Sequence, residues 1–237
     1  MSTKTSPPMR HSVILFACLI ATAWLQGCGR STAELGAKQQ QQTPQPTDVL
    51  LIVDGITITF GDLLAGTAFF DTLQSEVSRR NKMQRVLEDF TLPLMLARRE
   101  FQKERAPLLE QALALSHVAG NVVELEARGK DLAGERRMVT PREVEIPIAI
   151  YLFDKEHIGG RSEPIELPQG FTVVGSRDLI EGKTTIGDRC DAVQVPFFTH
   201  NNRDWRDWLR KQQEAMSKKV TYFHPDFRDA IPPWLLP

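Results

Sequence analysis

The chain has 237 residues, with 29 Lys and Arg against 30 Asp and Glu, so its formal net charge is −1. This balance lacks the basic excess that is typical of nucleic-acid binding, and we expect no nucleic acid among the partners. The length is sufficient for one or two folded domains with an ordinary apolar core.

Residues 1–27 have the pattern of a secretory signal peptide. Lys4 and Arg10 make its start basic, and residues 13–25 are almost wholly apolar. A helix that spans a bilayer needs about 20 apolar residues, and this run is shorter. The pattern therefore favours a cleaved signal peptide over a transmembrane anchor.

The segment Leu25-Gln26-Gly27-Cys28 resembles the lipobox of bacterial lipoprotein precursors. The resemblance implies that a signal peptidase cuts before Cys28 and that Cys28 then carries a diacylglyceryl group and an acyl chain such as palmitate. Two or more acyl chains anchor a protein stably, so we expect the membrane as a partner through the Cys28 lipid. Gly29, where an Asp would resemble an inner-membrane retention signal, favours the periplasmic face of the outer membrane.

Residues 28–47 read as the lipidated cysteine and a flexible Gln- and Pro-rich tether, because they contain almost no large apolar side chain. Cys18 falls in the signal peptide, so Cys190 is the only cysteine left in the folded part and no intramolecular disulfide can form. We interpret Cys190 as a buried apolar residue rather than a reactive thiol.

The folded part is expected to begin at residue 48 with a β-hairpin. Residues 49–53 are apolar, Asp54-Gly55 is a strong two-residue turn signal, and residues 56–59 alternate in polarity. Thr59 and Asp62 have the spacing of a helix start.

Apolar residues at helical spacing then predict three helices, over residues 63–77, 83–97 and 108–125. Pro93 lies inside the second pattern, where a proline removes a backbone hydrogen bond, so we expect a kink or break there. Residues 48–135 are thus predicted to form a hairpin and helical lobe.

Residues 140–237 are predicted to form a β-rich module with a C-terminal helix. Residues 144–153 have the composition of a long strand, in which Pro147 indicates an edge or a bulge. Residues 171–174 and 192–198 are further strand candidates, and residues 203–219 read as a helix. Trp205 and Trp208 share one face of that helix, and we interpret them as core packing rather than a docking surface. The predicted fold class is α+β.

The segment from Val53 to Leu63, V-D-G-I-T-I-T-F-G-D-L, resembles the start of the N-terminal domain of SurA-type and parvulin-associated periplasmic foldases. Residues 86–101 resemble the helix that follows in that family, and the match covers about a quarter of the chain. The His-Ile-Leu strand and the G-G-D-L-G-W segment of parvulin domains are absent from the sequence. The resemblance implies a chaperone-like helical lobe without an isomerase site.

The sequence contains neither a complete phosphate-binding loop nor the nucleophile elbow of a hydrolase. Gly182-Lys183-Thr184 has the end of a phosphate-binding loop, but Arg177 stands where its first glycine is required, so we expect no nucleotide. Gly175-Ser176 is not followed by the glycine of a nucleophile elbow.

No metal or other cofactor is expected either. The loop histidines could converge on a metal with an aspartate, but their spacing does not indicate this. The histidines are His157, His200 and His224, and the aspartates are Asp178, Asp188 and Asp226. Glu143 and Glu145 could act as an acid and base pair, or could equally be a solvated edge. We therefore assign no catalytic residue.

The sequence as a whole favours an envelope lipoprotein that binds unfolded or partner envelope proteins. We expect an apolar client-binding groove in the helical lobe, formed by Leu87, Phe90, Leu94, Leu113 and Val122. The alternatives are an accessory subunit of an envelope assembly or secretion complex, and a divergent peptidyl-prolyl isomerase.

Overall fold

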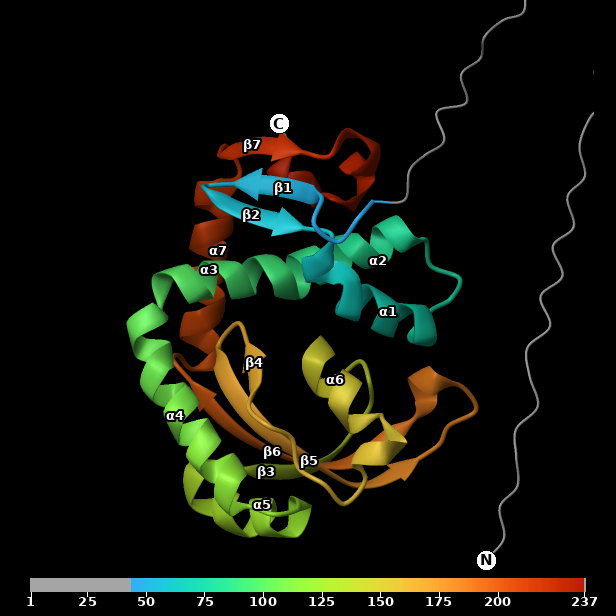
Figure 1. Cartoon of the computed structure of the whole chain (residues 1–237), viewed down its shortest axis with the longest axis vertical. Helices are drawn as coiled ribbons and strands as arrows, with labels where there is room; N and C mark the ends of the chain where they lie inside the picture. The colour runs from blue at the N-terminus through green and yellow to red at the C-terminus, as the bar shows by residue number, and fades with distance from the viewer. Residues whose placement is uncertain (1–43, 237) are drawn as a thin grey trace, which may run out of the picture. The chain divides into compact units, whose positions relative to one another are not determined.

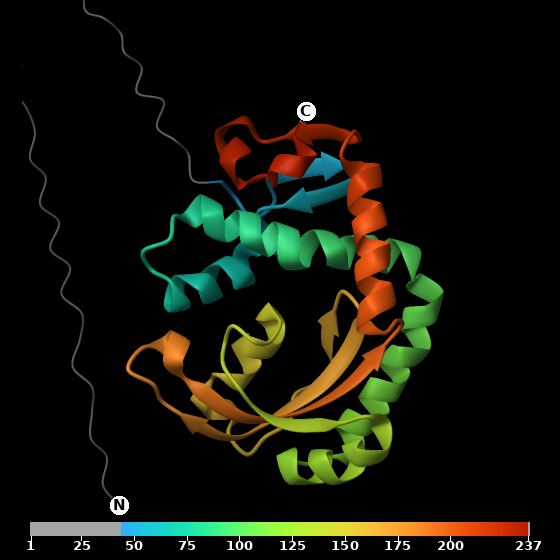
Figure 2. The same ribbon diagram turned by 180° about the vertical axis from the view of Figure 1, so that it is seen from behind.

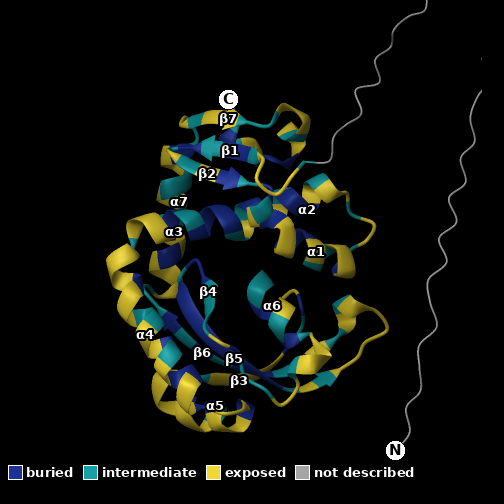
Figure 3. Ribbon diagram, in the orientation of Figure 1, coloured by how far each residue is buried: buried dark blue, intermediate teal, exposed yellow. Residues whose placement is uncertain are grey.

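The computed structural model describes residues 44–236, so the signal peptide, Cys28 and most of the tether lie outside the described residues (Figure 1). Two antiparallel sheets of three and four strands, together with helices, confirm the predicted α+β class. We call residues 44–100 and 202–236 the terminal lobe, because both ends of the described chain contribute to one apolar core. Residues 102–200 form the inserted lobe, whose core residues lie in two further clusters. Figure 3 shows the buried residues of its sheet in dark blue.

The terminal lobe begins with the predicted hairpin of β1 (Val49–Val53) and β2 (Ile56–Thr59). Asp54 and Gly55 at its tip have φ angles of 49° and 77°. Two positive φ angles are typical of a type I′ turn, whose twist matches that of the flanking strands. The prediction of this hairpin is confirmed.

The helix start predicted beside Asp62 is confirmed as well. The Asp62 carboxylate accepts hydrogen bonds from the backbone N–H and the hydroxyl of Thr59, both at 2.8 Å. A 3-10 turn (Gly61–Leu63) then leads into α1 (Leu64–Leu73).

The break predicted at Pro93 is present as a π-helical turn (Leu87–Thr91) between α2 (Arg79–Val86) and α3 (Leu92–Glu100). Pro93 lies in the first turn of α3, directly after the π-helical turn, and has no N–H to bond to the preceding turn. The widened turn before Pro93 accommodates the lost bond without ending the helical rod.

The terminal lobe is completed by residues from the other end of the chain. Strand β7 (Val220–Phe223) pairs antiparallel with β1, which gives the sheet order β2-β1-β7. Helix α7 (Asn202–Met216) connects the inserted lobe back to this sheet, as the rear view shows (Figure 2). The β1–β7 pairing crosses the boundary that the sequence placed between the two predicted modules.

The C-terminal residues pack into the core of the terminal lobe. Ile231 and Leu235 are buried with β1 and α2, and the Trp234 indole donates to Glu88 at 2.9 Å. Trp205 and Trp208 share one face of α7, with ring centroids 4.8 Å apart.

The third predicted helix is two helices in the structure, α4 (Gln102–Val118) and α5 (Val122–Gly129). The two helices are separate because Asn121 begins a new one. Its side chain accepts hydrogen bonds from backbone N–H groups in the first turn of α5 and so caps this helix. Pro107 lies inside α4 rather than at its start.

The inserted lobe has a four-stranded antiparallel sheet in the order β3-β6-β5-β4. Helices α4 and α5 cover one face of this sheet. The strands are β3 (Glu135–Val139), β4 (Ile165–Leu167), β5 (Gly170–Ile180) and β6 (Arg189–Phe198).

The strand predicted over residues 144–153 is wrong: this segment forms α6 (Ile146–Leu152), which packs on the other face of the sheet. Pro147 is in the first turn of the helix, a position that suits proline, and does not mark an edge strand. Ile148 and Leu152 are buried, and their spacing of four residues places both on the sheet side of a helix. The remaining short elements are 3-10 turns, Lys130–Leu132, Lys155–His157, Thr185–Gly187, Pro225–Ala230 and Pro233–Leu235.

Candidate functional site

The five residues predicted to form a client-binding groove do not share a surface, so this prediction is wrong. Leu87 is fully buried in the terminal-lobe core, and Val122 is buried between α5 and the sheet of the inserted lobe. Leu94 is 7% exposed, and Leu113 is half-buried on α4. Phe90 is the member of the five that lines the cavity described next.

The cavity that Phe90 lines has a volume of about 720 Å³ and lies between the two lobes. One wall comes from the terminal lobe, and the other comes from residues 141–146 and 167–169 of the inserted lobe. We call this space the interlobe cleft. Its terminal-lobe wall includes Phe69, Phe70, Arg85, Asp89, Phe90 and Trp205.

The terminal-lobe wall is largely aromatic. Phe69 and Phe70 follow each other on α1, with ring centroids 6.1 Å apart. The Arg85 guanidinium lies 5.2 Å from the centroid of the Phe70 ring and donates to the Gln74 side chain at 3.1 Å. Flat aromatic faces of this kind offer large contact areas to apolar groups at a small entropic cost.

Carboxyl groups face the same cleft from both lobes. The pKa of Asp89 is raised because burial disfavours the charged form and the neighbouring Glu88 carboxylate adds repulsion. The pKa of Glu143 is lowered because its carboxylate accepts the backbone N–H of Thr140 at 2.7 Å. Glu145 also lines the cleft.

A second cavity of about 410 Å³ adjoins the interlobe cleft and shares Glu143, Glu145 and Gln169 with it. Its floor includes Gln194, Pro196 and Phe198 of β6, which alternate with the buried residues beneath α4 and α5. Helix α6 covers Cys190 and Ala192 farther along the same face and leaves this part open. The two cavities are therefore continuous at the three residues that they share, and a ligand longer than one cavity could occupy both.

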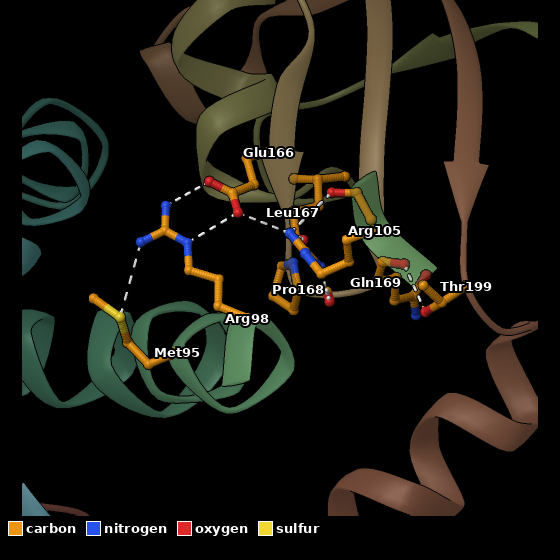
Figure 4. A network of polar contacts seen from close by, with 9 residues as sticks. Met95, Arg98, Arg105, Glu166, Leu167, Pro168, Gln169 and Thr199 are labelled. Atoms are coloured by element: carbon orange, nitrogen blue, oxygen red, sulfur yellow. Dashed lines mark hydrogen bonds and ion pairs between the residues drawn. The ribbon is translucent and has the colours of Figure 1, made fainter. Parts of the chain in front are cut away.

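The two lobes are joined beside the cleft by a network of ion pairs on Glu166 of β4 (Figure 4). Arg98 of α3 binds both carboxylate oxygens of Glu166, and Arg105 of α4 donates to Oε1 at 2.9 Å. Burial alone would raise the pKa of Glu166, but the hydrogen bonds and charges of these two arginines hold it below its usual range. Glu166 is therefore ionised and links the two lobes.

Arg105 also fixes the turn between β4 and β5. Its guanidinium donates to the carbonyl oxygens of Pro168 at 2.9 Å and Leu167 at 3.0 Å, and it lies over the Phe171 ring. Residues 167–169 line the interlobe cleft, so Arg105 holds one edge of that cleft in place.

The chain crosses between the lobes twice, at residues 100–102 and 198–202, and aromatic rings pack where the crossings meet. Phe101 contacts His200 at 4.7 Å and Trp208 at 4.8 Å between ring centroids. These contacts bring the two crossings together at one side of the cleft.

The three loop histidines lie in separate environments and do not converge. His157 stacks on Tyr151, His200 lies against Phe101, and His224 lies against Phe60 and Phe227. Within residues 44–236, no group of three His, Cys, Asp or Glu residues could hold a metal ion.

The structure also shows where the other residues that the sequence analysis considered for chemistry lie. Cys190 is fully buried beneath α6, and burial raises the pKa of its thiol. Residues 182–184 belong to the connection between β5 and β6. Glu143 and Glu145 lie in the turn before α6 and not in a strand, and both line the two cavities.

Sequence reasoning missed most of the cleft residues, although one signal was available. Adjacent residues of a helix are about 100° apart, so at least one of Phe69 and Phe70 was expected at the edge of the core-facing stripe. Nothing in the sequence paired Glu166 with Arg98 and Arg105, because these residues are more than 60 positions apart.

No helix among the described residues is both long and apolar enough to cross a bilayer. Comparison of the chain with protein-family models, with curated proteins and with solved structures found no match in any of the three.

Proposed function

We propose that this protein is a lipid-anchored lipoprotein of the cell envelope that binds extended apolar segments of other polypeptides in the interlobe cleft. The observation that carries the proposal is the cleft itself, a cavity of about 720 Å³ with an aromatic wall and charged groups from both lobes. Ligand sites in proteins commonly combine apolar walls with a few polar groups that fix orientation.

Two features of the sequence support the location and the kind of ligand. The lipobox-like segment before Cys28 and the tether that follows it would hold the folded part near a membrane. The resemblance to the N-terminal domain of SurA-type foldases favours polypeptide as the ligand. Anchoring would raise the local concentration of the cleft at the membrane surface.

The aromatic wall can be tested with Phe69, which belongs to none of the apolar core clusters of the described chain. We expect Phe69→Ser to weaken binding of an unfolded client about tenfold, because a well-placed aromatic contact contributes about 1 to 2 kcal/mol. The measurement uses the lipidated full chain in nanodiscs, with light scattering to follow client aggregation and fluorescence to follow client binding.

Val123→Ser is the matched control, because Val123 is 57% exposed on α5 and lines neither the interlobe cleft nor the adjoining cavity. It should leave aggregation suppression unchanged. Equal effects of the two variants would contradict a role for the cleft. Turnover in a prolyl isomerase peptide assay would favour the isomerase alternative, and one stoichiometric envelope partner in a pull-down would favour the accessory subunit.

The anchoring part is tested separately at Cys28. We expect Cys28→Ala to abolish incorporation of labelled palmitate and to release the protein from the membrane fraction, because no other acylation site is proposed. The measurement is radiolabelling followed by membrane fractionation. Retention of both label and membrane association in the variant would contradict the lipoprotein assignment.

A further inference from the structure

The interlobe cleft holds two carboxylates that the protein itself does not pair. Asp89, from the π-helical turn, and Glu145, from the segment before α6, both line the cleft. Within residues 44–236, neither side chain has a hydrogen bond or an ion pair. The two groups come from opposite lobes, so a ligand in the cleft would lie between them.

The cleft has fewer cationic groups than carboxylates, and one of the cationic groups already has partners within the protein. Arg85 lies over Phe70 and donates to Gln74, and Arg142 shares its segment with Glu143 and Glu145. The cleft lining therefore carries three carboxylates against two guanidinium groups. A bound cation would improve this balance, whereas a bound anion would have to compete with the excess carboxylate.

The surroundings of Asp89 add a geometric reason for a cation. Phe69, Phe70 and Phe90 line the same wall, so an aliphatic stem could lie against the rings while its charged end reaches the carboxylate. Lysine and arginine side chains have this combination of a long apolar stem and a cationic end. Asp89 is exposed on this wall and has no ion pair among the described residues, so its carboxylate is free to meet such a cation.

We infer that the interlobe cleft selects polypeptide segments in which a lysine or arginine stands between apolar residues, with Asp89 binding the cation. The inference rests on the polypeptide binding proposed above. It defines a sequence preference that the apolar wall alone would not produce.

The test compares short fluorescent peptides that differ at one position, where lysine is replaced by its uncharged analogue norleucine or by glutamate. Two phenylalanines flank this position in each peptide. The full-length lipidated chain should bind the lysine peptide about tenfold more tightly than the norleucine peptide, as expected for one charge-assisted hydrogen bond. Asp89→Asn should remove this preference while leaving the norleucine peptide bound as before.

The preference should also depend on pH. The charged groups near Asp89 are Glu88 on the same π-helical turn and Arg85 at the end of α2, and Arg142, Glu143 and Glu145 line the opposite wall of the cleft. Because the pKa of Asp89 is raised, its carboxylate becomes protonated earlier than an ordinary aspartate as the pH falls. The lysine preference should therefore weaken as the pH falls, and it should do so at a higher pH than an ordinary aspartate would allow, while norleucine binding should not change.

Glu110→Gln is the matched control, because Glu110 is exposed on α4 and lies outside the cavities. It should keep the lysine preference. The inference is overturned if wild-type protein binds the lysine and norleucine peptides equally, if Asp89→Asn keeps the preference, or if the glutamate peptide binds most tightly. In those cases the apolar peptides still bind and the proposed function stands, whereas failure of every peptide to bind would contradict the proposed function itself.

Discussion

Replacing Arg105 with methionine is expected to lower the free energy of unfolding by about 3 to 5 kcal/mol. The Arg105 residue is 5% exposed, and its guanidinium donates to the Leu167 and Pro168 carbonyl groups and to the Glu166 carboxylate. Methionine has a similar length but no donor, so these acceptors would lose their partner where little water can replace it. Urea denaturation of the full chain, followed by tryptophan fluorescence, measures the change.

Arg98→Met provides the matched comparison, because Arg98 binds the same carboxylate but its side chain is 47% exposed. Water can replace much of that interaction, so we expect a loss of about 1 kcal/mol or less. If the two variants lost the same amount, burial would not be the reason that the Arg105 contacts matter.

Deleting residues 218–237 is expected to unfold the terminal lobe. The deletion removes β7 from the side of β1 and takes Ala230, Ile231 and Leu235 out of the core. Burying one large aliphatic side chain contributes about 1.5 to 3 kcal/mol, and a whole domain is stable by only about 5 to 15 kcal/mol. Hydrogen exchange should show that the amides of β1 and β2 lose their protection, while those of β5 and β6 keep more of it.

Tyr222→Ser is the comparison for this deletion, because Tyr222 is 39% exposed and its replacement leaves the strand in place. It should leave the protection of β1 unchanged. A deletion variant in which β1 and β2 remain protected would instead support an independently folding lobe over residues 48–135, as the sequence indicated.

The elements that were predicted correctly are determined by residues close together in the sequence. The hairpin at Asp54-Gly55 follows from a turn that requires positive φ angles, and the break before α3 follows from the missing N–H of Pro93. The error over residues 144–153 has a physical reason. Its isoleucines and tyrosine favour a strand by propensity, but burial of Ile148 and Leu152 against the sheet favours the helix.

The cleft and the lobe arrangement could not be predicted from single-sequence patterns. β1 pairs with a strand about 170 positions away, and Glu166 is held by arginines of two other elements. Periodicity shows that a side chain is apolar or a segment is helical, but not which distant segment it meets. For the same reason Leu87 and Val122 were assigned to one groove, although each is buried in a different core.

The central place of β1 in its sheet also determines when the terminal lobe can form. Thr221 and Ile52, which contact each other across β1 and β7, are 169 positions apart in the chain. Until the last residues are available, β1 has one open edge and an apolar face without cover, and such edges pair readily with other chains. Contacts between distant segments also form slowly. We propose that this protein shields apolar segments of other polypeptides, and its own apolar strand β1 stays exposed until the C-terminal residues pair with it.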